Sequence, residues 1–185
     1  MRKMILVLVV AGFLGLCMAD LADAADTADI TVTVTCRSLG VTVDTATWPI
    51  GFVEANSEVV KAATIVVTNS GNASETYQLK LTDPTVWNAV QTDAALAAEK
   101  YQLGAIFQTT ATAAPVAVDY VDSADFVSTS YVSCSATVFA KTIGNGLNVA
   151  ASGLRDLWLY FHAPLSTAET AQKSIVVTVK AIAGA

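Results

Sequence analysis

Residues with catalytic or metal-binding chemistry are few in this chain, which has 1 histidine and 3 cysteines among 185 residues. His162 is the only side chain available for a Ser-His-Asp or Cys-His arrangement, and it follows Phe161 two residues before Pro164. The sequence contains no nucleophile motif, no Gly-rich phosphate loop and no Cys-x-x-Cys or His-x-x-x-His spacing. We therefore expect a surface or edge histidine at a strand end, a protein that is not an enzyme, and no cofactor.

A calcium site is the one metal-binding arrangement that the carboxylates suggest. Asp119, Asp122 and Asp125 recur at every third residue. The ligands of an EF-hand loop instead occupy alternate positions, and Ca²⁺ needs six or more oxygens. The sequence therefore predicts a solvated acidic loop, with a metal site at these three aspartates as the alternative.

Aromatic side chains gather in the apolar run that ends near His162. Trp158 and Tyr160 alternate with Leu157, Leu159 and Phe161, so the two sets occupy opposite faces of one strand. A strand that is apolar on both faces is usually central and covered on both sides. The alternative is that Trp158 and Tyr160 form an exposed ligand face that stacks on the sugar rings of an extracellular glycan.

The first residues have the form of a secretion signal. Arg2 and Lys3 precede residues 5–16, which carry no polar side chain. That run is shorter than the ~20 apolar residues that span a bilayer. A small-x-small cleavage site ends at Ala24, with Ala19 as the alternative. The pattern therefore predicts a cleaved signal peptide and an exported protein.

Removal of residues 1–24 leaves residues 25–185 as a single domain, secreted or at the cell surface and without membrane contact. Cys17 is lost with the leader, so Cys36 and Cys134 remain. Because exported proteins fold under oxidising conditions, the sequence predicts a Cys36–Cys134 disulfide, and the alternative is two separate buried thiols. A bridge that closes the loop of residues 36–134 stabilises the fold by roughly 4–5 kcal/mol in the chain-entropy description.

Period-two alternation of apolar and polar residues runs through most of the chain and predicts β-strands. The alternating runs occupy residues 30–36, 41–44, 63–68, 76–81, 101–107, 132–138, 157–161 and 175–179. A turn signal at residues 69–72 predicts a hairpin between the strands that flank it, and residues 94–100 are the one helix-like patch. About eight to ten short strands predict an all-β fold, a single antiparallel Ig-like or jelly-roll-like β-sandwich.

A family resemblance indicates the same fold class. Residues 48–53 (Trp-Pro-Ile-Gly-Phe-Val) are followed, after a short spacer, by residues 63–72 (Ala-Thr-Ile-Val-Val-Thr-Asn-Ser-Gly-Asn). Over residues 46–82 this pattern resembles Ig-like domains of the hydin and abnormal-spindle type, and similar runs occur in secreted bacterial surface β-sandwiches. The resemblance implies a structural or adhesive module and no catalytic residue.

Composition limits the classes of function. Hydrophobic residues make up 54% and charged residues 14%, which excludes a disordered chain. The chain has 10 Lys and Arg against 16 Asp and Glu, a net charge of -6 that argues against nucleic-acid binding. We expect a secreted, non-enzymatic structural protein, a self-associating subunit of an extracellular filament, surface layer or matrix. The alternative is a carbohydrate-binding or adhesive module.

Self-association would use the start of the mature chain as a donor strand. Ile30, Val32 and Val34 place three apolar side chains on one face of an extended segment, with Thr between them. Such a strand can add to the sheet edge of a second copy through main-chain hydrogen bonds and side-chain pockets. We expect head-to-tail or edge-to-edge association through residues 25–35, and the alternative is pairing within the same domain. Residues 72–74 (Asn-Ala-Ser) also fit a glycosylation sequon.

Overall fold

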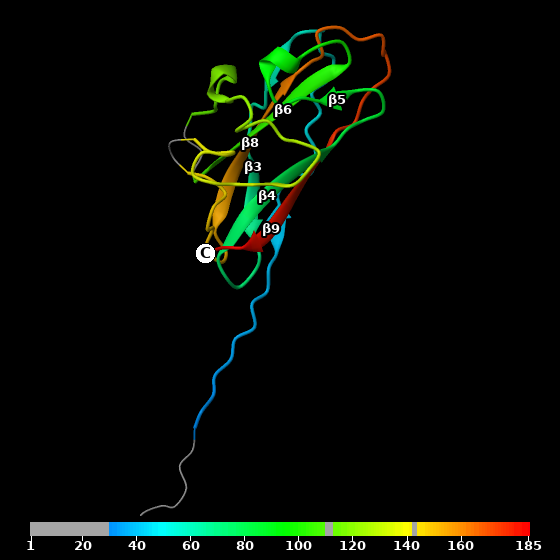
Figure 1. Ribbon diagram of the computed structural model, residues 1–185. Coiled ribbons are helices and arrows are strands. Elements are labelled where there is room, and N and C mark those ends of the chain that lie inside the picture. Colours follow the sequence, from blue (N-terminus) through cyan, green and yellow to red (C-terminus); the bar gives the residue numbers. More distant parts are fainter. Residues whose placement is uncertain (1–29, 110–112, 142–143) are drawn as a thin grey trace, which may run out of the picture. The chain divides into compact units, whose positions relative to one another are not determined.

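A computed structural model of the chain describes residues 30–109, 113–141 and 144–185 (Figure 1). The predicted signal peptide, residues 1–24, lies outside the described residues. The chain divides into two units, residues 1–35 and residues 36–185. The larger unit carries the fold.

The larger unit consists almost entirely of β-strands and loops, which confirms the all-β class. Its other regular elements, within the described residues, are two short 3-10 turns, η1 (Asp93–Ala95) and η2 (Ala117–Asp119). The helix-like patch at residues 94–100 forms no α-helix: its first two residues belong to the 3-10 turn η1, and a strand begins at its last residue, Lys100. No helix in the described part of the chain has the length and apolar character needed to cross a membrane.

The larger sheet has six strands arranged around a long central one. Its path runs β1 (Val41–Val43), β3 (Ile65–Asn69), β8 (Leu154–His162), β6 (Lys100–Gln108) and β5 (Asn88–Ala89), and β2 (Glu58–Val60) also pairs with β8. β3 pairs with the first residues of β8, and β2 pairs with its last residues. β6 also pairs with β8. All these pairings are antiparallel except that of β5 with β6, which is parallel. The sheet is therefore mixed and not, as the sequence predicts, purely antiparallel.

The smaller sheet has three strands, in the order β7 (Val132–Ser133), β4 (Glu75–Thr82) and β9 (Val176–Ala183). β4 and β9 pair antiparallel along their whole length, from Glu75 opposite Ala183 to Thr82 opposite Val176. The two strands lie side by side in Figure 1. β7 pairs with only two residues of β4, so the strand expected over residues 132–138 forms only at its start.

The turn after Asn69 connects the two sheets and does not form the expected hairpin. β3 belongs to the larger sheet and β4 to the smaller one, so the two strands do not pair. The buried Asn69 side chain holds this crossing: its Nδ2 donates to the carbonyls of Ala73 and Val149, and its Oδ1 accepts from the N–H of Gly71. The hairpin prediction is wrong because this amide stabilises a loop that leads away from β3 instead of back along it.

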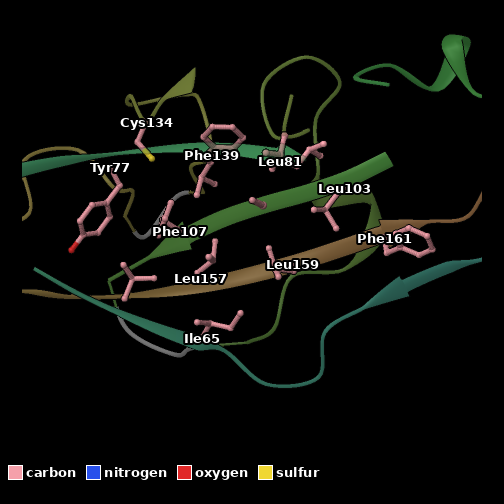
Figure 2. Packing of buried hydrophobic residues seen from close by; sticks show 14 of the residues in the cluster. Ile65, Tyr77, Leu81, Leu103, Phe107, Cys134, Phe139, Leu157, Leu159 and Phe161 are labelled. Carbon is pink, nitrogen blue, oxygen red and sulfur yellow. The ribbon is translucent and has the colours of Figure 1, made fainter. Parts of the chain in front are cut away.

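One hydrophobic core lies between the sheets and includes residues of both (Figure 2). Inward-facing side chains of β3, β4, β6 and β8 fill it, and Figure 2 labels Ile65, Tyr77, Leu81, Leu103, Phe107, Leu157, Leu159 and Phe161 among them. Tyr77 and Phe107 have no exposed surface, and their rings contact each other with centroids 5.6 Å apart. Because each fully buried large apolar side chain contributes ~1.5–3 kcal/mol, this core is the main source of stability.

Candidate functional site

Trp158 and Tyr160, the predicted ligand face, are buried, with exposed fractions of 5% and 4%. The ring of Tyr120 stacks on Tyr160 with centroids 4.9 Å apart, and Phe126 packs on the same ring at 5.8 Å. Together with Ile106 these rings form a second, smaller apolar cluster. The exposed aromatic platform is therefore wrong, and the other interpretation, a strand covered on both faces, is confirmed.

His162 ends β8 at a strand terminus, as expected, but it is buried and not on the surface. Its Nε2 lies 3.2 Å from Asn56 Oδ1, and its Nδ1 lies 3.9 Å from a carboxylate oxygen of Glu58. The pairing of β2 with β8 places Glu58 opposite His162. Through these contacts His162 links β8 to the chain around β2.

The three aspartates do not converge on one point, because each has its own hydrogen-bond partner. Each carboxylate accepts a hydrogen bond from a different backbone N–H. For Asp119, Asp122 and Asp125 in turn, the donors belong to Val116, Asp93 and Val121. Lys141 also pairs with Asp119, and these contacts lower the pKa of Asp119. The described residues contain no group of three His, Cys, Asp or Glu side chains that could hold a metal ion.

Asp125 departs from the solvated loop that the sequence predicts. Its side chain is buried, and this burial raises the pKa of its carboxyl group. The N–H of Val121 donates to its Oδ2 at 2.9 Å. This carboxylate therefore closes a turn inside the protein instead of facing water.

Cys36 and Cys134 are free thiols in the structure, so the predicted disulfide is not formed. Cys134 is 2% exposed and belongs to the core, and burial raises the pKa of its thiol to about 12. A thiol with so high a pKa stays protonated and unreactive at neutral pH. Cys36 is exposed. Residues 30–36 belong to neither sheet, so the strand predicted there does not place Cys36 in the core beside Cys134.

The N-terminal segment, defined as residues 30–35, leaves its apolar side chains exposed. Ile30, Val32 and Val34 have exposed fractions of 88%, 79% and 78%. No strand forms over the segment, so the predicted donor strand has no strand partner within the described part of the chain. An extended segment with unpaired backbone groups and alternating apolar side chains is a template for pairing with another chain.

Asn72 fixes the chain where the segment joins the larger unit. Its Nδ2 donates to the carbonyl of Cys36 at 2.9 Å, and its Oδ1 accepts from the N–H of Ser38 at 2.8 Å. The backbone N–H of Asn72 donates to the carbonyl of Ser38. A little farther along, the N–H of Gly40 donates to the buried carboxylate of Glu75. Asn72 of the crossing loop and Glu75, the first residue of β4, therefore hold the chain in place immediately before β1.

β9 has one unpaired side, because the smaller sheet ends there. Tyr77 and Leu79, which face inward from the neighbouring β4, have no exposed surface. Val177 and Val179, which pack against the same core from β9, are only partly buried. β1 lies close to β9, and its Val41 packs against the same core. The core is nevertheless less completely covered beside β9 than beside β4, and we call the side of β9 that no strand pairs with the β9 edge.

Sequence reasoning predicts the strand at residues 175–179 but not its position at the edge of a sheet. Alternation is the same in a central and an edge strand of a sheet with one covered face. The one available signal is Lys180, since a charge on the outer face of a strand is typical of an edge. The site as a whole offers backbone donors and acceptors with apolar side chains, which suits binding of an extended peptide.

Comparisons of the chain with protein-family models, with curated proteins and with solved structures found no match. The resemblance to Ig-like domains over residues 46–82 therefore stands on the sequence pattern alone.

Proposed function

We propose that this protein is a non-enzymatic structural subunit of an extracellular filament, surface layer or matrix, and that copies of it assemble with one another. The observation that carries this proposal is the exposure of Ile30, Val32 and Val34 in an alternating segment. Three regularly spaced apolar side chains favour a partner, because burial of each one contributes ~1.5–3 kcal/mol.

The fold that we propose is an Ig-like β-sandwich that follows a cleaved signal peptide. Two observations support it: the sheets share one core, and the chain crosses from the larger to the smaller sheet after β3. Connections of this kind between sheets build Ig-type sandwiches. The leader pattern of residues 1–24 supports export to the extracellular space or the cell surface.

The chemistry of the segment supports a copy of the same chain as the partner. Its residues are Ile, Val and Thr only, without a charge. Such a segment suits an uncharged sheet edge, where main-chain hydrogen bonds provide affinity and alternate side chains fill apolar gaps. The glycan-binding alternative is less well supported, because Trp158 and Tyr160, the side chains expected to stack on sugar rings, are buried. The contacts of His162 with Asn56 and Glu58 support a structural over a catalytic role.

Size-exclusion chromatography with light scattering tests the proposal. The full chain is expressed with its leader in an exporting host, and the processed protein is compared with a variant whose mature chain starts at Thr35. We expect the processed protein to form concentration-dependent oligomers, visible as filaments or sheets by electron microscopy, and the shortened variant to remain a monomer. If both proteins are monomers at high concentration, the proposed function is wrong.

A further inference from the structure

β9 is the one long strand that ends a sheet in the part of the chain that the structure describes. It has 8 residues, whereas the other strands at the margins of the sheets, β1, β2, β5 and β7, have 2 or 3. Proteins keep exposed edge strands short or protect them with proline, bulges or charges, because a long edge pairs with other chains. β9 contains no proline, and its only charged residue is Lys180.

We propose that the N-terminal segment of one molecule adds as a strand to the β9 edge of a second copy. The inference rests on the proposed function, self-association through this segment, and it adds the surface that accepts the segment. Ile30, Val32 and Val34 would lie next to the inward-facing Val177 and Val179 and would cover the margin of the core that β9 leaves open.

The dimensions of the two partners agree. Six residues of extended chain span ~20 Å at ~3.3 Å per residue, which is less than the length of β9. Both strands place apolar side chains at every second residue, so three apolar residues of the segment match the spacing of the inward face of β9. The threonines of the segment would then share the outer face with Thr178 and Lys180.

The chain that follows the segment is anchored near the end of β9. Asn72 holds Ser38, and Ser74 in the same loop accepts from the N–H of Gly184 just after β9. Residues 30–38 contain no glycine, proline, asparagine or aspartate, the residues that favour tight reversals, so the sequence there does not favour a hairpin within one molecule.

The donor and the acceptor are different surfaces of the same molecule. A contact of this heterologous type repeats from one copy to the next, because each molecule that accepts a segment still has its own segment to donate. Open chains of molecules are the expected product, in agreement with a filament or matrix.

Disulfide trapping between two variant proteins tests the inference. Donor proteins carry Thr31→Cys, Thr33→Cys or Thr35→Cys together with Cys36→Ser, and the acceptor protein carries Thr178→Cys with Cys36→Ser. The three donors cover the registers that place a threonine opposite Thr178. After mixing and mild oxidation, we expect at least one donor to form a disulfide-linked heterodimer, identified by peptide mass mapping under non-reducing conditions.

Lys80→Cys is the matched control acceptor. Lys80 lies opposite Thr178 on β4, one strand farther from the β9 edge. An added strand would be ~10 Å from this position, beyond the ~7 Å that a disulfide allows between Cα atoms. We expect at least tenfold less heterodimer with this control than with Thr178→Cys. Lys180→Cys is a second acceptor variant on the exposed face of β9. It allows the same test if the Thr178→Cys protein does not fold.

Two results would overturn the β9 acceptor. One is assembly of the processed protein without any donor crosslink to position 178 or 180, which leaves self-association intact but assigns it to another surface. The other is a crosslink that forms only within single molecules of a variant that carries donor and acceptor cysteines together. If the parent protein does not assemble at all, the proposed function fails first, so the two failures are distinguishable.

Discussion

The ring of Tyr120 fills the space that Gly104 leaves open on β6: a Cβ on Gly104 would lie 2.6 Å from Cδ1 of Tyr120. Tyr160 is the cross-strand neighbour of Gly104 on β8, and the same ring stacks on it. The missing side chain therefore creates the slot that admits Tyr120. Through this slot the chain around η2 covers the aromatic face of β8 and turns it into a second, smaller core.

Gly104→Ala is expected to displace Tyr120 and to lower the free energy of unfolding by about 1–3 kcal/mol, the usual cost of overpacking. Urea unfolding followed by tryptophan fluorescence measures this difference. In a Tyr120→Ala background the added methyl group has room, so there the cost of Gly104→Ala should fall to a few tenths of a kcal/mol. An equal cost in both backgrounds would contradict the steric explanation.

The sequence predicts most of the long strands because apolar residues alternate with polar ones wherever one face of a strand packs on the core and the other does not. The runs at residues 76–81, 101–107 and 157–161 correspond to β4, β6 and β8, whose inward side chains form the core. Pairing is harder to predict, since it depends on distant residues. The turn signal after Asn69 is local, but the bond from its Nδ2 to the carbonyl of Val149 is not, and this contact helps to hold a crossing between sheets.

The candidate site was predictable only in part, for the same reason. Alternation in residues 30–36 indicates a strand but not whether a partner strand exists in the same chain. Trp158 and Tyr160 carry no signal that distinguishes an exposed platform from a covered face. The residues that cover Tyr160 are Tyr120 and Phe126, and both lie in a segment without periodicity. The position of β9 at a sheet margin follows from the order of all strands together.

The two cysteines of the larger unit are expected to differ in reactivity. Under native, non-reducing conditions one thiol per chain, Cys36, should react with a thiol reagent, because it is exposed. Cys134 should react at least ~100-fold more slowly, since it is buried and its thiol pKa is about 12. Cys36→Ser should remove the fast phase. Absence of any free thiol after unfolding without reductant would instead demonstrate the disulfide that the sequence predicts.

Asp125→Asn should change how stability depends on pH. Burial raises the pKa of Asp125 above its unfolded value of about 3.9, so folding favours the protonated form. The contribution of this carboxyl group to the stability of the folded protein is therefore present below about pH 4 and is lost as the pH rises through the raised pKa. An asparagine can still accept from the N–H of Val121 and does not ionise. We expect the stability of this variant relative to the parent to increase between pH 4 and pH 7, measured by urea unfolding.

Asp119→Asn is the matched control with the opposite sign. The Lys141 ammonium and the N–H of Val116 lower the pKa of Asp119, so its contribution is present above about pH 4 and is lost as pH falls through the lowered pKa. The variant should be less stable than the parent near pH 7, by up to about 1 kcal/mol for a partly exposed pair at the surface. The deficit should shrink below pH 4. Parallel pH profiles for the two variants would contradict both assignments.

Val32→Asp and Thr33→Asp separate strand addition from other kinds of association. Both variants add one negative charge to the same exposed segment, so neither should change the fold of the larger unit. In an added strand, position 32 faces the core of the partner and position 33 faces solvent, because successive side chains point to opposite faces. Burial of an unpaired carboxylate should weaken association at least ~100-fold for Val32→Asp, against less than ~10-fold for Thr33→Asp. Analytical ultracentrifugation of the processed proteins gives both dissociation constants. Equal weakening would show that charge alone matters and would exclude a strand that inserts one face into its partner.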